Sequence, residues 1–314
     1  MKTKILLVLL NCLLFILIVG CTLQGDNSAE LQKKEQDNLK QYLAINKITQ
    51  APTTDGLYYI EKTVGKGINP TVTDFALVNY SIYLIDGTLV ETTDHTLATN
   101  NNILPIAALE GPAKMYINYI IYKGFVEGLC MMKDSGGKAK LIVPSKLALG
   151  EFYSNSIPSY STLLIDLELV KVIKDPVADD RASILKWLDT LSLKPGDTTF
   201  VPGIYVKVDS LGSGDSIKNG NVVTVQYRGR LLDGRYFSNP LKTLDSYTFA
   251  IGSNSVITGF EKIVAYLKKG SVVRTIIPYS LAYGASGINN TYGQVEIPIY
   301  SSLYYEIKVT NVTK

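Results

Sequence analysis

The sequence predicts an α+β protein built from two similar units, each an antiparallel twisted β-sheet wrapped on one short α-helix, with a further helix preceding each unit. The chain has 314 residues, enough for two domains with separate cores. Short β-patterned segments follow a helical segment twice along it. Residues of the first copy recur in the second at one offset of 147 residues, without a gap: Gly56 as Gly203, Tyr80 as Tyr227, and Asp86-Gly87 as Asp233-Gly234.

The first 21 residues, MKTKILLVLLNCLLFILIVGC, have the pattern of an export signal. Lys2 and Lys4 precede an apolar run, residues 5–19, and Gly20-Cys21 follow it. A transmembrane anchor is the alternative, but the run is short for a span of about 20 residues. The ending IVGC resembles the bacterial lipobox. That resemblance implies a signal peptide over 1–20 and a lipid anchor to the membrane through Cys21.

Two amphipathic helices precede the two units. Residues 21–55 contain a polar linker and a helical pattern over 29–48, with Leu31, Leu39, Tyr42, Leu43 and Ile48 roughly on one face. A second linker helix lies within 175–202, with apolar positions Ile184, Leu185, Trp187 and Leu188. The predicted domains are therefore 56–174, called domain 1, and 203–314, called domain 2.

The elements of domain 2 follow in order. Residues 222–232 alternate as a strand, with Val223, Val225 and Tyr227 on one face. Asp233-Gly234 then marks a hairpin, because Gly accepts positive φ. A strand over 247–252 and a helix over 259–270, ending at Gly270, come next. Residues 271–284 predict a strand that enters a loop, and 301–312 a closing strand.

Composition and residue types exclude several kinds of site. Apolar residues make up 46% and charged residues 19%, and the net charge of +3 becomes near neutral without Lys2 and Lys4, so no nucleic-acid partner is expected. The one histidine, His95, lies in a polar stretch predicted to be a solvated loop, and no metal-ligand spacing is found. Cys130 is the one cysteine after Cys21, and its apolar context predicts a buried core thiol.

Four stretches of domain 2, VQYRGRLLDGRYF, VITGFEKIV, IPYSLAYGASG and LYYEIKV, resemble the FKBP-type peptidyl-prolyl isomerases in the family's order over 203–312. A weaker match, including VNYSIYLIDGTLV and YKGFVEGL, covers about 56–173 of domain 1. The mature chain thus resembles a lipid-anchored tandem FKBP protein, of the kind found as lipoproteins in Bacteroidetes. The resemblance implies proline-containing polypeptide clients and a site without cofactor or metal.

The same resemblance assigns the site residues of domain 2. It implies a catalytic aromatic pocket with Phe260 as its floor and Tyr283 as a hydroxyl donor to a substrate carbonyl. The other catalytic residues implied are Tyr227, Phe237 and Tyr305, and the implied substrate-binding residues are Tyr247, Val256, Ile257 and Ile297. The N–H of Ile257 is expected to donate to substrate, and Gly259 is expected to let the chain turn tightly before Phe260. Each aromatic taken alone fits an ordinary core better than a pocket. The joint match of these residues in order and spacing favours the pocket.

Both copies depart from the family pattern. In domain 2, Ser238 stands where the family often has Asp, and the loop over 287–297 is longer than in the smallest members. In domain 1, 12 more residues separate Gly87 from Gly124 than separate Gly234 from Gly259. Its equivalent site reads Tyr80, Val90 with Glu91 after it, Phe125, Leu149 and Ile165, which predicts a degenerate site.

Two functions follow from these observations. The first is a peptidyl-prolyl cis-trans isomerase that assists folding of exported or envelope proteins through the dry aromatic pocket of domain 2. The alternative is a non-catalytic chaperone or protein-binding lipoprotein that uses the two domains as docking modules. The state of the aromatic pocket discriminates between them, because domain 2 keeps the family's aromatic residues and domain 1 does not.

Overall fold

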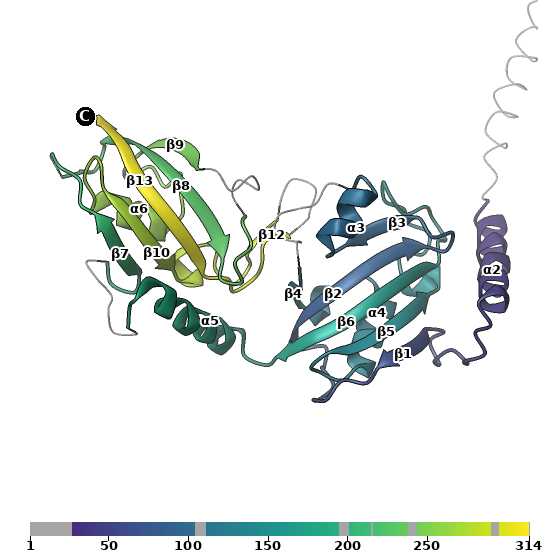
Figure 1. Cartoon of the computed structure of the whole chain (residues 1–314). Helices are drawn as coiled ribbons and strands as arrows, with labels where there is room; N and C mark the ends of the chain where they lie inside the picture. Colours follow the sequence, from purple (N-terminus) through teal and green to yellow (C-terminus); the bar gives the residue numbers. More distant parts are fainter. Residues whose placement is uncertain are drawn as a thin grey trace, which may run out of the picture.

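The computed structural model describes residues 27–103, 111–194, 201–214, 216–237, 244–289 and 295–313 (Figure 1). The predicted signal peptide, Cys21 and Ser238 lie outside the described residues. Within the described ranges, no helix combines the length and the hydrophobicity that crossing a bilayer requires. Helix α2 (Ser28–Ile45) stands before the first sheet, as the sequence predicts, and ends short of Ile48.

Domain 1 is one antiparallel sheet with a helix on its inner face. Its strands lie in the order β1-β5-β6-β2-β3, and β4 also pairs with β2. The bounds of its elements are β1 Tyr58–Thr63, β2 Phe75–Leu84, β3 Leu89–Thr92, α3 His95–Asn100, β4 Ala113–Tyr116, η2 Ile117–Tyr119, α4 Lys123–Met131, β5 Gly137–Val143, η3 Ser145–Leu147 and β6 Leu163–Ile173.

Domain 2 repeats this arrangement. Its main sheet has the order β7-β10-β13-β8-β9, in which β7-β10-β13-β8 reproduce β1-β5-β6-β2 of domain 1. The bounds, with the linker helix first, are α5 Pro176–Leu191, β7 Tyr205–Ser210, β8 Val222–Leu231, β9 Asp245–Ala250, α6 Thr258–Ala265, β10 Val272–Ile277, η4 Tyr279–Leu281, β11 Ile288–Asn289, β12 Val295–Ile297 and β13 Leu303–Thr313. The predicted α+β class is confirmed.

The cores follow from the alternation of each strand. In β8, Val223 and Val225 are fully buried and contact the face covered by α6, where Ile263 and Val264 are also buried. In domain 1, Val78 of β2 and Leu129 of α4 belong to the corresponding core. The predicted hairpin turns form at equivalent places, with Gly87 at φ 92° and Gly234 at φ 95°.

Two local predictions are wrong. His95 is not in a loop: it is the first residue of α3, whose start is capped by the Asp94 carboxylate accepting from the Leu97 N–H at 2.9 Å. This helix lies within the extra residues of domain 1. Helix α6 ends at Ala265 rather than at Gly270, because Gly270, at φ 89°, serves the turn that leads into β10.

The linker helix α5 packs on domain 2. Asp175 caps its first turn, and Pro176 occupies a first-turn position where no N–H is needed. Its face of Ile184, Leu188 and Leu191 joins a small core with Ile276 and Tyr304. The indole of Trp187 lies 4.9 Å from the Tyr304 ring and donates to the carbonyl of Leu232. The helix is thus part of the structural unit of domain 2.

An acidic residue of each preceding helix binds the base of the loop after the next-to-last core strand. In domain 2, the Asp180 carboxylate accepts from the Ser302 N–H at 2.8 Å and the Ser302 hydroxyl at 2.6 Å. In domain 1, Glu35 of α2 accepts from the N–H and hydroxyl of Ser145, both at 2.6 Å, and from the Thr162 hydroxyl at 2.8 Å. The contact matters most for α2, which has no buried residue.

Candidate active site

Four aromatic rings of domain 2 converge beside α6. Phe260 is 5% exposed, and its ring centroid lies 5.1 Å from that of Tyr305 and 5.7 Å from that of Tyr227, both in edge-to-face orientation. Phe237 meets Tyr305 edge to face at 5.5 Å. Such pairs fix one another's orientation beyond the burial of their area. The four rings therefore form one rigid aromatic cluster, with Phe260 at its base.

The sheet register sets this cluster. Tyr227 of β8 lies opposite Ile307 of β13, and Tyr305 lies opposite Gly229, so the residues at these positions project to one face. Phe260 comes from the first turn of α6, which packs on that face. Phe237 arrives from the segment after the turn at Gly234, where Tyr236 forms a bridge with Arg230.

Gly259 acts differently from what the sequence suggests. It lies inside α6 with ordinary helical conformation, so it makes no special turn. A Cβ atom at this position would lie 2.3 Å from Cγ2 of Ile277 and 3.1 Å from the carbonyl oxygen of Leu281. In domain 1 a Cβ on Gly124 would lie 2.5 Å from Cγ1 of Val143. The glycine thus lets the helix approach the neighbouring strand, which brings the phenylalanine into contact with Tyr227 in domain 2 and with Tyr80 in domain 1.

Gly229 is a site residue that the sequence analysis missed. A Cβ atom there would lie 2.4 Å from Cζ of Phe237 and 3.1 Å from Cε1 of Tyr305. The bare backbone of β8 is therefore the surface on which the Phe237 ring rests. A glycine in the interior of a strand commonly marks such a close approach, so the signal was present in the QYRG stretch.

Two donors border the cluster. Among the described residues, no acceptor is found for the N–H of Ile257, whose carbonyl accepts from Glu261 at the start of α6. Tyr283, half-buried, follows η4 and packs against the same core. Burial, and then the charge of Glu296, raises the pKa of Tyr283. Its hydroxyl consequently stays protonated, and so able to donate, throughout the neutral range.

The remaining predicted residues lie around this centre. Val256 and Ile257 are half-buried and pack against the core, and Ile297 of β12 is 2% exposed. Tyr247 lies at the rim: it is 41% exposed and stacks on Phe249 with ring centroids 6.0 Å apart.

Asp245 was also missed. It lies directly opposite Tyr227 in the register of β8 and β9, and residues paired in this way project to the same face. Burial, and then the negative charge of Asp245, raises the pKa of Tyr227. A carboxylate therefore stands beside this tyrosine although Ser238 occupies the position where the family often has Asp. The sequence alone does not give the register between β8 and β9, so it could not place Asp245 opposite Tyr227.

Domain 1 keeps part of the constellation. Tyr80 and Phe125 meet edge to face with centroids 5.5 Å apart, as Tyr227 and Phe260 do. The Tyr80 hydroxyl donates to the carboxylate of Glu91. Burial, followed by the charge of Glu91, raises the pKa of Tyr80 well above its usual range and that of Tyr122 to about 12. Both phenols thus remain protonated beside an acidic group.

The other wall of domain 1 is aliphatic. Ile82 stands at the register position of Gly229, directly opposite Ile165, and both are fully buried. Val90 and Leu149 are half-buried and pack on the same core, in place of an aromatic ring and a phenol. The structure brings these residues near Tyr80 and Phe125 but leaves no side-chain hydroxyl at the position of Leu149.

Other reactive groups fall outside these two sites. Cys130 of α4 is half-buried rather than fully buried, and burial raises the pKa of its thiol. A thiol with a raised pKa carries little of the reactive thiolate at neutral pH. In the part of the chain that the structure describes, no three His, Cys, Asp or Glu side chains come together in a way that would hold a metal ion.

One family model matches both domains, and known proteins share sequence with part of the chain. The family model described as "FKBP-type peptidyl-prolyl cis-trans isomerase" matches residues 66–170 and 214–310, which together exceed half of the chain. The protein FkpA of Aeromonas hydrophila is 34% identical over 155 residues, 49% of this chain and 50% of that protein. FkpA of Escherichia coli K12 is 29% identical over 142 residues, 45% of this chain and 49% of the relative. The chain thus spans about half the length of these curated relatives.

Solved structures give weaker likenesses. The crystal structure of the three FKBP domains of wheat FKBP73 is matched over 83% of this chain and 96% of that one, with 23% identity and a TM-score of 0.32. The crystal structure of FkpA from Escherichia coli is matched over 51% of this chain and 70% of that one, with 26% identity and a TM-score of 0.39. The sequence match of the family model to both domains decides the assignment: this chain belongs to the FKBP-type peptidyl-prolyl cis-trans isomerase family.

Proposed function

We propose that domain 2 is a peptidyl-prolyl cis-trans isomerase that uses its aromatic cluster and no covalent or acid–base step. The observation that carries the proposal is the convergence of Tyr227, Phe237, Phe260 and Tyr305 beside the N–H of Ile257, for which the described part of the chain holds no acceptor. A hollow lined by rings is suited to a proline ring, and two donors at its edge are suited to the carbonyls that flank it.

The chemistry explains why such a site suffices. Rotation about a peptide C–N bond has a barrier of about 18–20 kcal/mol, because the bond has partial double-bond character. The twisted transition state loses that resonance, so an apolar surrounding favours it over the planar ground state. Donors fixed at Tyr283 and Ile257 would orient the adjacent carbonyls, and interactions stronger in the transition state than in the ground state accelerate the step.

The test is turnover of a proline-containing tetrapeptide by the chain lacking residues 1–21. Tyr283→Phe removes only the hydroxyl, and we expect kcat/KM to fall about tenfold, the equivalent of one hydrogen bond worth about 1.4 kcal/mol. The matched control is Tyr122→Phe in domain 1, which should leave turnover unchanged. Absence of turnover by the folded unsubstituted chain would rule out catalysis and favour the binding function below.

We further infer a non-catalytic, protein-binding role for domain 1. It is supported by the aliphatic wall of Ile82 and Ile165 and by Leu149, which offers no hydroxyl where domain 2 has Tyr283. Domain 1 keeps Phe125 and Tyr80 as an apolar floor. It would therefore hold an apolar or proline-containing segment of a client without lowering the rotation barrier.

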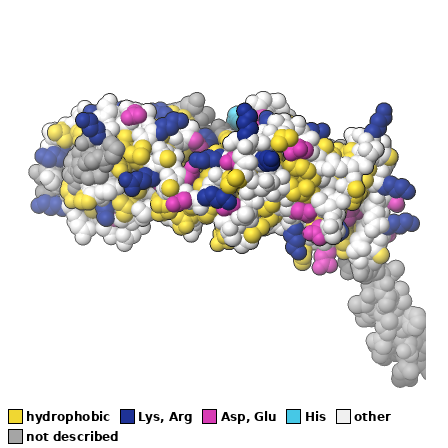
Figure 2. Space-filling model, turned by 90° about the horizontal axis from the view of Figure 1, so that it is seen from below, with side chains coloured by type: hydrophobic (Ala, Val, Ile, Leu, Met, Phe, Trp, Pro, Cys, Tyr) yellow, Lys and Arg dark blue, Asp and Glu magenta, His cyan; other side chains and the backbone are white. Residues whose placement is uncertain are grey.

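The place of action follows from the N-terminal sequence. The lipobox-like ending at Cys21 supports an anchored protein of the cell envelope, on the periplasmic side or in the outer membrane, that assists exported or envelope clients. On the face shown in Figure 2, positive and negative side chains are interspersed with hydrophobic ones. A surface of this mixed kind suits transient contact with unfolded polypeptides rather than with a strongly charged partner.

A further inference from the structure

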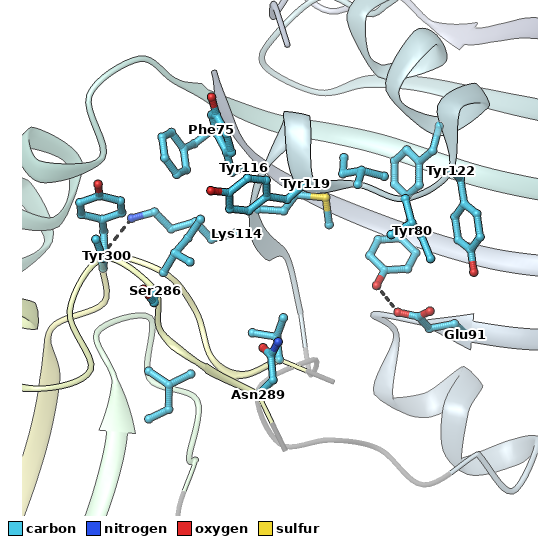
Figure 3. A pocket seen from close by; sticks show the side chains of 18 of the residues that line it. Phe75, Tyr80, Glu91, Lys114, Tyr116, Tyr119, Tyr122, Ser286, Asn289 and Tyr300 are labelled. Carbon is cyan, nitrogen blue, oxygen red and sulfur yellow. Dashed lines mark hydrogen bonds between the residues drawn. The ribbon is translucent and has the colours of Figure 1, made fainter. Parts of the chain in front are cut away.

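A cavity of about 920 Å³ lies between the two domains (Figure 3). One end is the hollow of domain 1, where Tyr80, Tyr122 and Glu91 lie together, and the opposite side is formed by domain 2, where Figure 3 places Ser286, Asn289 and Tyr300. Its volume falls at the upper end of the roughly 300–1,000 Å³ of ligand-binding pockets in general. No side chain of the aromatic cluster in domain 2 lines it.

Contacts across the domain boundary hold the two walls. The ammonium of Lys114, in β4 of domain 1, lies 3.3 Å from a carboxylate oxygen of Asp179 in α5 and donates to the carbonyl of Tyr300 at 3.3 Å. The ring of Phe75 meets that of Tyr300 edge to face at 5.6 Å. Lys114 and Asp179 are largely shielded from water, with 11% and 17% of their side chains exposed, so screening weakens this contact little.

Adjacent residues of α5 bind the two domains. Asp179 pairs with Lys114 and Lys171 of domain 1, whereas Asp180 accepts from Ser302 of domain 2. A single turn of one helix therefore fixes both walls of the cavity, and they face each other in a set geometry. A ligand that spans them does not have to bring the domains together, which removes an ordering cost from binding.

The chemistry of the lining indicates the ligand. Aromatic side chains from both domains line the cavity: Phe75, Tyr80, Tyr116, Tyr119, Tyr122, Phe125 and Tyr300. Domain 2 adds Ile297 and Ile299. At the edge, Tyr119 and Ile121 are 77% and 69% exposed, so this apolar and aromatic surface is accessible. Aromatic surfaces of this kind bind side chains of many shapes at low conformational cost.

A backbone donor narrows the choice to a polypeptide. Among the described residues, the N–H of Tyr122 has no acceptor, while its carbonyl accepts from Phe125 and Val126 at 3.0 and 3.2 Å. This N–H occupies the position that Ile257 has in domain 2, and it borders the floor of the domain 1 hollow. A peptide carbonyl is the acceptor that fits a lone N–H beside an apolar hollow.

We propose that this cavity is a second client-binding site, in which an extended apolar polypeptide segment places one side chain in the domain 1 hollow and continues across to domain 2. Binding of a side chain in the domain 1 hollow rests on the binding role proposed for domain 1. Contact of the same segment with domain 2 goes beyond that role, because client binding then requires the domain 2 wall as well. Holding a segment here keeps the client next to the aromatic cluster of domain 2 without occupying that cluster.

The test measures binding of a fluorescently labelled twelve-residue peptide rich in Leu and Phe, with one central Pro, to the chain lacking residues 1–21. Tyr119→Ser alters the domain 1 wall and Ser286→Arg obstructs the domain 2 wall, and both positions are exposed, so the fold should persist. We expect each substitution to weaken binding at least fivefold. Tyr153→Ser, at an equally exposed tyrosine outside the cavity, is the matched control and should bind as the unsubstituted chain does.

The outcomes separate this proposal from the proposed catalysis. Turnover of a short proline tetrapeptide by the same variants should stay unchanged, because none of the substituted residues belongs to the aromatic cluster. If only Tyr119→Ser weakens binding, the site is domain 1 alone and the composite cavity is refuted. If neither wall affects binding, the proposal fails even where the isomerase is active. Binding that requires both walls in an inactive chain supports the cavity and rejects catalysis.

Discussion

The two domains share a floor and differ in one wall. Both place a phenylalanine from the first turn of a helix edge to face with a tyrosine of the equivalent strand, β2 in domain 1 and β8 in domain 2. Beyond this, three positions that touch one another change together: Gly229, Phe237 and Tyr305 of domain 2 correspond to Ile82, Val90 and Ile165 of domain 1. A glycine and two aromatic side chains of domain 2 thus stand where domain 1 has three aliphatic side chains.

The aromatic cluster of domain 2 depends on the absent side chain of Gly229 as much as on the rings themselves. Phe237 can lie over β8 only because Gly229 has no side chain, and Tyr305 reaches its edge-to-face contact from the opposite strand. In domain 1, Ile82 and Ile165 lie opposite each other at the same positions of the equivalent strand pair, and both are buried.

The largest effect is expected from adding a side chain at Gly229, where domain 1 has Ile82. In Gly229→Ala, the new Cβ would lie 2.4 Å from Cζ of Phe237, so the ring must move. Since small displacements of a positioning group cost about 100-fold in rate, we expect kcat/KM for a proline tetrapeptide to fall about 100-fold. The backbone of Gly229 has no positive φ, so the domain should still fold. The control, Ile82→Val in domain 1, should leave turnover unchanged.

Turnover at the unsubstituted level in a folded Gly229→Ala chain would show that Phe237 does not form the working wall. Circular dichroism of the variant, compared with that of the unsubstituted chain, checks that the fold is retained. The experiment thus tests the assignment of the wall independently of the Tyr283 hydroxyl.

Local sequence patterns predicted much of this architecture. Strand alternation, the Asp-Gly turns and the common offset predicted the fold class, and the family motifs located the aromatic residues. Gly229 was overlooked because its role is a contact with Phe237, whose ring returns over the strand from beyond the turn. Asp245 and Tyr227 lie far apart in sequence, and only the register of β9 brings them together. Periodicity within one strand contains no such information.

The preceding helices illustrate a second limit. Their apolar faces predicted that they are helices, but not where they dock. The docking depends on Asp180 and Ser302, and on Glu35 with Ser145 and Thr162, which are more than a hundred residues apart along the chain. In both domains an acid of the preceding helix thus binds the base of the loop before the domain's last strand, at the end before β13 in domain 2 and at both ends in domain 1. Because the partners are so far apart in sequence, local patterns contain no sign of this contact.

The second largest effect is expected from removing this contact. Asp180 is 5% exposed, and Asp180→Ala would leave the N–H and hydroxyl of Ser302 buried without it. An unsatisfied buried group costs about 1–3 kcal/mol, so the free energy of unfolding of domain 2 should fall by about 2–3 kcal/mol in denaturant titrations. Because the Ser302 hydroxyl also accepts from Tyr279 at the start of η4, ahead of Tyr283, turnover should fall as well.

Glu35→Ala is the counterpart in domain 1. Glu35 is half-exposed, so water replaces part of what is lost, and we expect a smaller cost of about 1 kcal/mol and no change in turnover. Equal costs in the two domains, or a loss of turnover in Glu35→Ala, would show that the two contacts do not act on separate sites.

The smallest expected effect is a difference in how stability depends on pH between variants of Asp179 and Asp180, two neighbouring acids of α5. Burial raises the pKa of Asp180 despite its bonds from Ser302, so its favourable contribution is complete below the unfolded pKa of about 3.9 and is lost as pH rises through the raised value. Burial acts on Asp179 too, but the hydrogen bond from Lys171 and the charges of Lys114 and Lys171 outweigh it and lower the pKa. Its contribution is present above about pH 3.9 and is lost as pH falls through the lowered value.

Asparagine at each position removes the titration while keeping the shape. The free energy of unfolding of Asp180→Asn, compared with that of the unsubstituted chain, should be highest at neutral pH. This difference should shift against the variant as the pH falls toward 4. Asp179→Asn should instead cost about 1 kcal/mol at pH 7, and this cost should disappear in acid. Denaturant unfolding at pH 7, 5 and 3.5 measures both differences. The same sign of pH dependence for the two variants would contradict the assignment of Asp179 to an ion pair that lowers its pKa and of Asp180 to a buried contact in which burial raises its pKa. That assignment is what makes the link to domain 1 sensitive to acid and the link to domain 2 resistant to it.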